Sequence, residues 1–164
     1  MTATGLPDAA IDRFERALAW LSALLLVVVL VALGRGWAHW GEVSPMIWLH
    51  LGAVLLALGL TPVLMLNPRG TRRHRQLGWV WCIAMFLTAA ASLFVQAIRP
   101  GHWSPIHLLS LYTIAAVPMI ILLARRHSVA QHRRKVRGMI VGALLIAGFF
   151  TFPFGRMLGR WLLG

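Results

Sequence analysis

The chain has 164 residues, 59% of them apolar and 12% charged, and its net charge is +12 with only four acids. This balance excludes an ordinary soluble domain, in which about a quarter of the residues are charged. The single cysteine, Cys82, excludes a disulfide framework and a zinc site built on cysteine pairs.

Five apolar runs are each long enough to cross a bilayer core of about 30 Å, which takes roughly 20 helical residues. None contains Asp, Glu, Lys or Arg, and they cover residues 17–34, 45–66, 77–98, 105–124 and 138–155. Backbone groups in lipid must be paired within the segment, and these runs are far longer than barrel strands. We therefore predict an all-α integral membrane bundle of five transmembrane helices.

The basic residues predict the topology of this bundle. Ten of the 16 Lys and Arg residues fall in two short loops, around 69–75 and 125–137. Two spans separate these loops, so both lie on one side, and short basic loops stay in the cytoplasm. We predict a bacterial inner-membrane protein with a cytoplasmic lead (residues 1–16) and a periplasmic carboxyl terminus. Topology explains the charge, so no nucleic-acid partner is expected.

The first span and its outer loop occupy residues 17–44. The span is rich in Leu and Val, and Ser22 is its one interior polar residue. We therefore predict a peripheral, lipid-facing helix beside a four-helix core in residues 45–164. Trp37 and Trp40 in the loop are typical of the aromatic belt at the headgroup level.

Local signals mark helix starts in the core. Pro45 is a favoured first helical residue, and Thr71 and Ser128 are expected N-caps of the third and fifth spans. These starts put His74 and His132 in the first turns of their helices.

The core contains an internal repeat, of the length of two membrane-crossing helices and a turn. In the first unit a proline follows the first histidine after 12 residues and a second histidine after 24; in the second unit these spacings are 11 and 25. The units span about residues 45–98 and 105–160, and their histidines are His50 and His74, then His107 and His132.

The repeat pairs histidines at two depths. If the units pack around a pseudo-twofold axis along the membrane normal, His50 faces His107 near the outer surface, and His74 faces His132 near the inner one. Two opposed imidazoles are the ligand set of six-coordinate haem iron, so we predict two haem b groups with these four histidines as iron ligands. Arginines at matching levels are expected to bind the haem propionates: Arg75 and Arg133 inside, Arg99 and Arg156 outside.

Each histidine pair also has a simpler explanation. His74 and His132 lie beside arginines at a cytoplasmic surface, where a basic residue needs no ligand. His50 and His107 have apolar neighbours, and a hydrogen-bonded packing histidine explains them as well as a ligand does. The matching spacing at both depths favours ligation. The other histidines fall in loops and are predicted to be solvated: His39, His102 and His127.

The order of these motifs resembles that of the bacterial membrane family known as domain of unknown function 2306, over residues 46–160. The resemblance rests on His50-Leu51-Gly52, His74-Arg75-x-x-Gly78, His132-Arg133 and the closing Phe152-Pro153-Phe154-Gly155-Arg156, where Phe154 interrupts a Pro-Gly-Arg element. The histidine layout is also similar to that of the cytochrome b561 family. That resemblance implies a four-helix core with one b-type haem near each surface, although the ascorbate motifs of that family are not found.

The leading hypothesis is a membrane-bound di-haem cytochrome, a transmembrane electron-transfer oxidoreductase whose donor could be a quinol or a redox partner protein. The alternative is a haem-free accessory or assembly subunit of a larger membrane complex. A transporter is a weaker hypothesis, because the spans hold no acid for coupling ions. No nucleophile–base–acid set is present for a hydrolase. The sequence does not define the oligomeric state.

Overall fold

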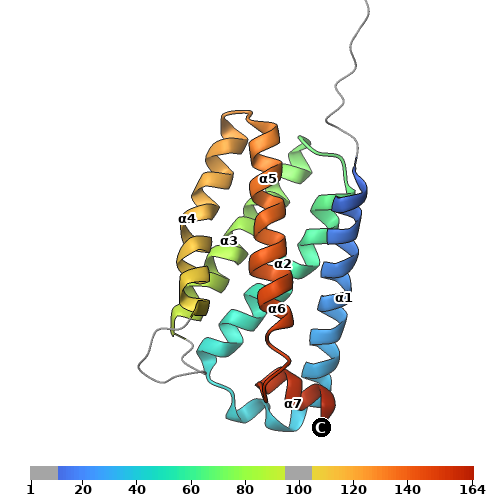
Figure 1. The fold of residues 1–164 in the computed structure, drawn as a ribbon, viewed down its shortest axis with the longest axis vertical. Helices are drawn as coiled ribbons and strands as arrows, with labels where there is room; N and C mark the ends of the chain where they lie inside the picture. Colours follow the sequence, from blue (N-terminus) through green and yellow to red (C-terminus); the bar gives the residue numbers. More distant parts are fainter. Residues whose placement is uncertain (1–10, 95–104) are drawn as a thin grey trace, which may run out of the picture.

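The computed structural model describes residues 11–94 and 105–164, and all regular structure in these ranges is helical (Figure 1). Four helices are long and apolar enough to cross a membrane, which is the character of a multi-pass membrane protein. They are α1 (Arg13–Arg35), α2 (Pro45–Leu66), α3 (Arg72–Phe94) and α4 (Pro105–Arg125).

Side-chain caps explain where these helices begin. The Asp12 carboxylate accepts a hydrogen bond from the N–H of Glu15 (2.8 Å) at the start of α1. Pro45 is the first residue of α2, as predicted, and Thr71 Oγ1 accepts the N–H of His74 (3.1 Å), which confirms the predicted cap of α3. Ser128 precedes α5 (Val129–Met139), but its side chain makes no capping hydrogen bond.

The last apolar segment, predicted as one span at residues 138–155, is not a single regular α-helix. Helical structure runs without interruption through α5, a π-helical segment η3 (Ile140–Ile146) and α6 (Ala147–Phe149). Figure 1 shows α5 and α6 in line along the length of the bundle. The chain then turns through Phe154 and Gly155, both with positive φ (64° and 68°). It ends in the short helix α7 (Met157–Leu163).

The helices form a closed ring. Each of α1 to α4 packs on the next, α5 packs on α4, and η3 contacts α1, α2 and α4. The first helix is a member of this ring through its contacts with α2 and η3. Small residues explain this, because Ala19, Ser22 and Ala32 are fully buried and let α1 approach its neighbours closely.

The short helix α7 covers one end of this ring. Its Leu158 is buried in a cluster with residues of α1 and α2, among them Val29 and Leu51. Gly159 makes the turn possible, because a Cβ there would lie 1.8 Å from the carbonyl oxygen of Phe152. The segment 150–164 is thus packed against the ring at the end opposite the 67–71 loop.

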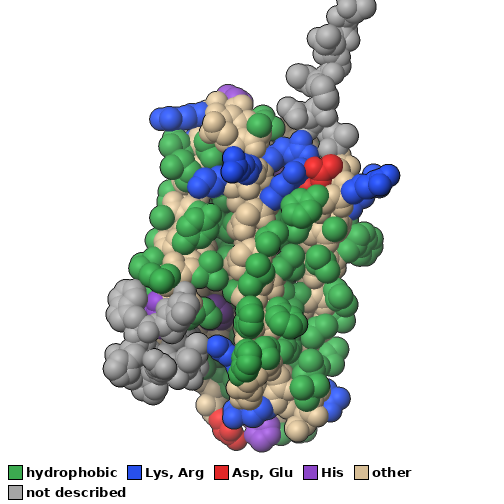
Figure 2. Space-filling view, viewed as in Figure 1, with side chains coloured by type: hydrophobic (Ala, Val, Ile, Leu, Met, Phe, Trp, Pro, Cys, Tyr) green, Lys and Arg blue, Asp and Glu red, His purple; other side chains and the backbone are tan. Residues whose placement is uncertain are grey.

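The surface is banded. Figure 2 shows hydrophobic side chains over the middle of this face and most of its Lys and Arg side chains near the upper end, where α1 begins and α2 ends. Exposed aromatic residues such as Trp20 and Trp79 belong to this apolar surface. This distribution is consistent with contact between the apolar helices and a lipid bilayer.

Candidate haem and ligand cavities

Two cavities lie inside the helix ring, one toward each end, and we name them after the predicted sides of the membrane. The outer cavity has a volume of about 550 Å³ and is lined by His50 of α2 and Arg156. The inner cavity has a volume of about 490 Å³ and is lined by His74 of α3 and His132 of α5. Both volumes are in the range of small-molecule and cofactor sites, roughly 300–1,000 Å³.

The inner cavity brings the predicted inner histidine pair together. His132 Nδ1 lies 3.1 Å from the carbonyl oxygen of Ile120, which can only accept, so this nitrogen carries a proton. In the neutral ring, Nε2 is then left with a lone pair. His74 Nδ1 is buried and has no hydrogen-bond partner within the described part of the chain. His132 therefore offers its Nε2 to a ligand, and His74 can offer only its Nε2, because its Nδ1 is buried.

Cations surround the inner cavity. Arg75, one of the predicted propionate partners, lines it and donates from Nη1 to the carbonyl oxygen of Gly70 (3.0 Å). Arg125 lies 5.8 Å above the ring of Trp79, a cation–π contact between α4 and α3. Arg133, the other predicted partner, is already bonded to Glu15, with Nε 3.1 Å from Oε1. Arg75 is therefore better placed than Arg133 to bind a further anion.

Glu15 is a central residue of this end that the sequence did not predict. Its side chain is only 2% exposed. Three arginines from different parts of the chain bond to it: Arg69 after α2, and Arg133 and Arg137 on α5. One indication of this role was present in the sequence: Glu15 is one of only four acids and lies in the first turn of a helix. Glu15 also lines the inner cavity and sets the charge balance there.

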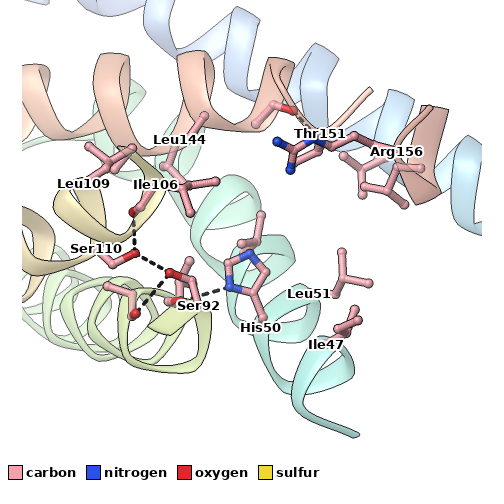
Figure 3. Close-up of a pocket in the computed structure, with 18 of the residues that line it drawn as sticks. Ile47, His50, Leu51, Ser92, Ile106, Leu109, Ser110, Leu144, Thr151 and Arg156 are labelled. Atoms are coloured by element: carbon pink, nitrogen blue, oxygen red, sulfur yellow. Dashed lines mark hydrogen bonds between the residues drawn. The ribbon is translucent and has the colours of Figure 1, made fainter. Parts of the chain in front are cut away.

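His50 lies on the wall of the outer cavity in a defined tautomer. Its Nδ1 donates to the carbonyl oxygen of Thr88 on α3 (2.9 Å), which leaves Nε2 with a lone pair in the neutral ring. Figure 3 shows the ring turned into the cavity from α2. The hydroxyl of Thr88 itself, Oγ1, is buried and has no hydrogen-bond partner within residues 11–94 and 105–164.

The remaining polar groups of the outer cavity come from α3, α4 and the closing turn. Ser92 and Ser110 are hydrogen-bonded to each other across α3 and α4, and Ser110 also donates to the carbonyl oxygen of Ile106 (2.9 Å). Arg156 lies on the opposite wall from His50, with its guanidinium toward the cavity (Figure 3). The outer cavity therefore combines apolar walls with a few separated polar groups.

His107 is buried, at 8% exposure, but it does not line the outer cavity. Ile106 and Ser110, on either side of it along α4, do line the cavity. The offset in the repeat accounts for this difference, because His50 is the sixth residue of α2 whereas His107 is the third of α4. Three helical positions shift a side chain by about 4.5 Å along the axis. The outer pair therefore does not share a cavity as the inner pair does.

The other predicted residues are distributed as follows. Arg99 and His102 lie outside the described residues. His39 is exposed and lies 3.2 Å from the Glu42 carboxylate. His127 is exposed, with a positive φ of 54°, at the rim of the inner cavity. Within the described ranges, no group of three or more His, Cys, Asp or Glu residues could hold a bare metal ion.

The two cavities nearly meet in the middle of the ring. On α2, Leu58 lines the outer cavity and Thr61 the inner one, and on α3 the same holds for Met85 and Cys82. Three residues of helix span about 4.5 Å. Trp81 fills part of this boundary and donates from Nε1 to Thr61 Oγ1 (3.0 Å). The two sites are therefore neighbours along the bundle axis.

The fold defines a helical protein of multi-pass membrane character with two internal cavities. No family model, curated protein or solved structure matches the chain. The resemblances to the domain of unknown function 2306 and to the cytochrome b561 family therefore stay predictions from the residues quoted for them.

Proposed function

We propose that this protein is a membrane-bound b-type cytochrome in which His74 and His132 are the two axial ligands of a haem. One observation carries the proposal: the two histidines come from different helices, α3 and α5, and line the same cavity. Haem iron in membrane bundles is held by such pairs of histidines on facing helices. When bound, the haem would supply one-electron redox chemistry.

The hydrogen bonding of the inner cavity fits this ligand. Histidines that bind iron donate their other ring N–H to a carbonyl or carboxylate, which fixes the tautomer and orients the ring. His132 donates in this way to Ile120. Arg75 at the cavity wall can bind a propionate, and Arg133 holds Glu15 in place beside it. The chain would thus bind, orient and shield the cofactor.

The repeat predicts a second haem between His50 and His107. His50 supports this prediction, since its Nε2 is left for a ligand, but His107 does not line the outer cavity. The proposal is therefore stronger for the inner haem than for the outer one. It also includes α5–α6 as a fifth span, the amino terminus in the cytoplasm and the bacterial inner membrane as the location.

Haem content of purified single variants tests the proposal. Wild-type protein from cells supplied with iron and a haem precursor should show a Soret band that sharpens and shifts on reduction. His74→Ala and His132→Ala should each remove the inner haem. His127→Ala is the matched control, because it lies at the rim of the same cavity but is exposed. Its haem-to-protein ratio should equal that of the wild type.

A haem-free accessory subunit is the second candidate function. It is favoured by the bonds from His50 and His132 to backbone carbonyls of neighbouring helices, which also serve helix packing at about 1 kcal/mol each. Colourless wild-type protein under the same growth conditions would reject the cytochrome and leave this candidate.

A further inference from the structure

We propose that the outer cavity binds the head group of a lipid-soluble hydroquinone, in place of a second haem. The inference deepens the proposed function, since a hydroquinone is a class of electron donor. Its binding can be measured whether or not haem is present. Two groups on the cavity wall carry the inference: the ring of His50 and the guanidinium of Arg156.

The ligand must carry a hydrogen-bond donor for His50. The Nδ1–H of His50 is used by the carbonyl oxygen of Thr88, so the ring offers the cavity an Nε2 lone pair. An acceptor of this kind pairs only with an N–H or O–H group. A hydroquinone has an O–H group to donate, whereas a carboxylate or an oxidised quinone has none.

The ligand must also carry a hydrogen-bond acceptor at its other end, for Arg156. The Arg156 guanidinium faces the cavity and makes no ion pair or hydrogen bond with a described residue. Each acid that the structure describes already has a cationic partner. Asp12 and Glu15 pair with arginines at the inner end, and Glu42 pairs with His39. The guanidinium can therefore donate to a ligand oxygen.

The space between these groups is apolar. Leu51, Leu109 and Leu144 line it, and Figure 3 shows His50 and Arg156 on opposite walls. The cavity is partly open rather than sealed. A ligand with a flat apolar ring and an oxygen at each end matches this arrangement. A fatty-acid carboxylate would satisfy Arg156 but would leave the His50 lone pair without a donor.

A second haem would use the same space in another way. It needs two histidines at one cavity, and His107 does not line this one. It would also place iron on the His50 nitrogen that the hydroquinone needs. The two ligands therefore exclude each other, and the experiment below separates them.

The test measures binding of one short-tailed probe in two redox states. Purified full-length protein in nanodiscs is titrated with decylubiquinol under argon and, separately, with decylubiquinone, and bound probe is counted after separation from empty nanodiscs. The wild type should bind the reduced form about tenfold more tightly, the typical effect of one good buried hydrogen bond. Decanoate should not compete at concentrations that leave the nanodiscs intact.

Each variant should change a different part of this result. His50→Ala should abolish the preference for the reduced form, because only that form donates to Nε2. Arg156→Gln should weaken both forms by about tenfold. Arg35→Gln is the matched control, because Arg35 is an exposed arginine that lines neither cavity. It should leave both affinities unchanged.

A milder variant guards against misfolding. Arg156→Lys keeps a cation at this position, and it should retain more binding than Arg156→Gln while the elution profile and helical circular dichroism stay as in the wild type. Equal binding of both redox forms by the wild type would overturn the proposal, as would displacement by decanoate. Loss of a haem in His50→Ala would also overturn it and would assign the cavity to a second haem. Absence of haem with intact hydroquinone binding would reject the cytochrome alone.

Discussion

Glu15 in α1 and Arg137 in α5 are 122 residues apart in the chain and are joined by two hydrogen bonds, from Arg137 Nε (3.1 Å) and Nη2 (2.8 Å) to Glu15 Oε1. Arg133 and Arg69 bond to the same carboxylate. A carboxylate this buried is stable as a charge only with such partners. The contact therefore links α1 to α5 and to the α2–α3 loop.

Replacing Glu15 by glutamine should destabilise the protein strongly. The change keeps the size of the side chain but takes the counter-charge from Arg69 and leaves Arg133 and Arg137 with Asp12 alone, which should cost about 3 kcal/mol. Unfolding in mixed micelles by a denaturing detergent measures the loss. Glu42→Gln is the control, because Glu42 is 76% exposed beside His39 and its removal should cost less than about 1 kcal/mol. Similar losses in the two variants would contradict a structural role for Glu15.

Asp12 should make the stability of α1 depend on pH at the acid end. The N–H of Glu15, and then Arg137 and Arg133, hold the pKa of the Asp12 carboxyl below its ordinary value of 3.8, against a smaller opposing effect of burial. The folded state therefore binds its proton less readily than the unfolded state. The resulting stabilisation is fully present above about pH 4 to 5 and is lost as pH falls through the lowered pKa.

Two substitutions separate the charge of Asp12 from its capping role. Asparagine is also a good N-cap, so Asp12→Asn should lose only the pH-dependent part. Asp12→Ala should lose about 1 kcal/mol more at pH 7, because the N–H of Glu15 is then uncapped. Thermal unfolding of the detergent-solubilised protein between pH 3 and 7 compares them. Parallel curves for wild type and Asp12→Asn over this range would refute the assignment.

A methyl group at Gly159 should release α7 from the ring. The added Cβ would lie 1.8 Å from the backbone oxygen of Phe152, which cannot rotate away as a side chain could. We expect Gly159→Ala to become sensitive to trypsin at Arg160 and to unfold at a lower temperature. Gly78→Ala is the control, because nothing lies within 4 Å of its Cβ position in α3. It should be neutral or stabilising by up to about 1 kcal/mol.

Cysteine labelling should establish which end of the bundle faces the cytoplasm. Single cysteines at Gln131, near the start of α5, and at Gly41, in η2 (Trp37–Glu42), are both exposed and lie at opposite ends of the ring. In a Cys82→Ala background, a membrane-impermeant maleimide should label Gly41→Cys in intact cells and Gln131→Cys only after lysis. Labelling of Gln131→Cys in intact cells would invert the predicted topology.

The sequence predicted the helices well because lipid leaves few alternatives for a long apolar segment. The 45–66 span and the cap at Thr71 are found as predicted. The role of α1 was missed, since the partners of Glu15 lie 54 to 122 residues away and no local pattern connects them. The five-span count, the membrane orientation and the haem ligands stay predictions.

The candidate sites were predicted less completely than the helices. Spacing alone brought His74 and His132 to one cavity, because both lie in the first turn of a helix that begins at the same end of the bundle. Spacing failed for His107, where a three-residue offset in α4 changes the level of the ring. The partner of His50 was not predicted, because the carbonyl oxygen of Thr88 belongs to a residue 38 positions away in the chain.

The π-helical segment Ile140–Ile146 sets the relative phase of the two ends of the last long helix. His132 lies before it and faces the inner cavity, whereas Thr151 and Arg156 come after it and face the outer one. A π turn holds one extra residue compared with an α turn. The seven-residue π segment therefore turns about as far as six residues of α-helix. Deleting the exposed Ile146 should restore α geometry and leave the downstream residues in nearly the same phase relative to His132, whereas the same seven residues wound as an α-helix would rotate them by about 100°. The extra residue thus lets a single helix serve two cavities at once.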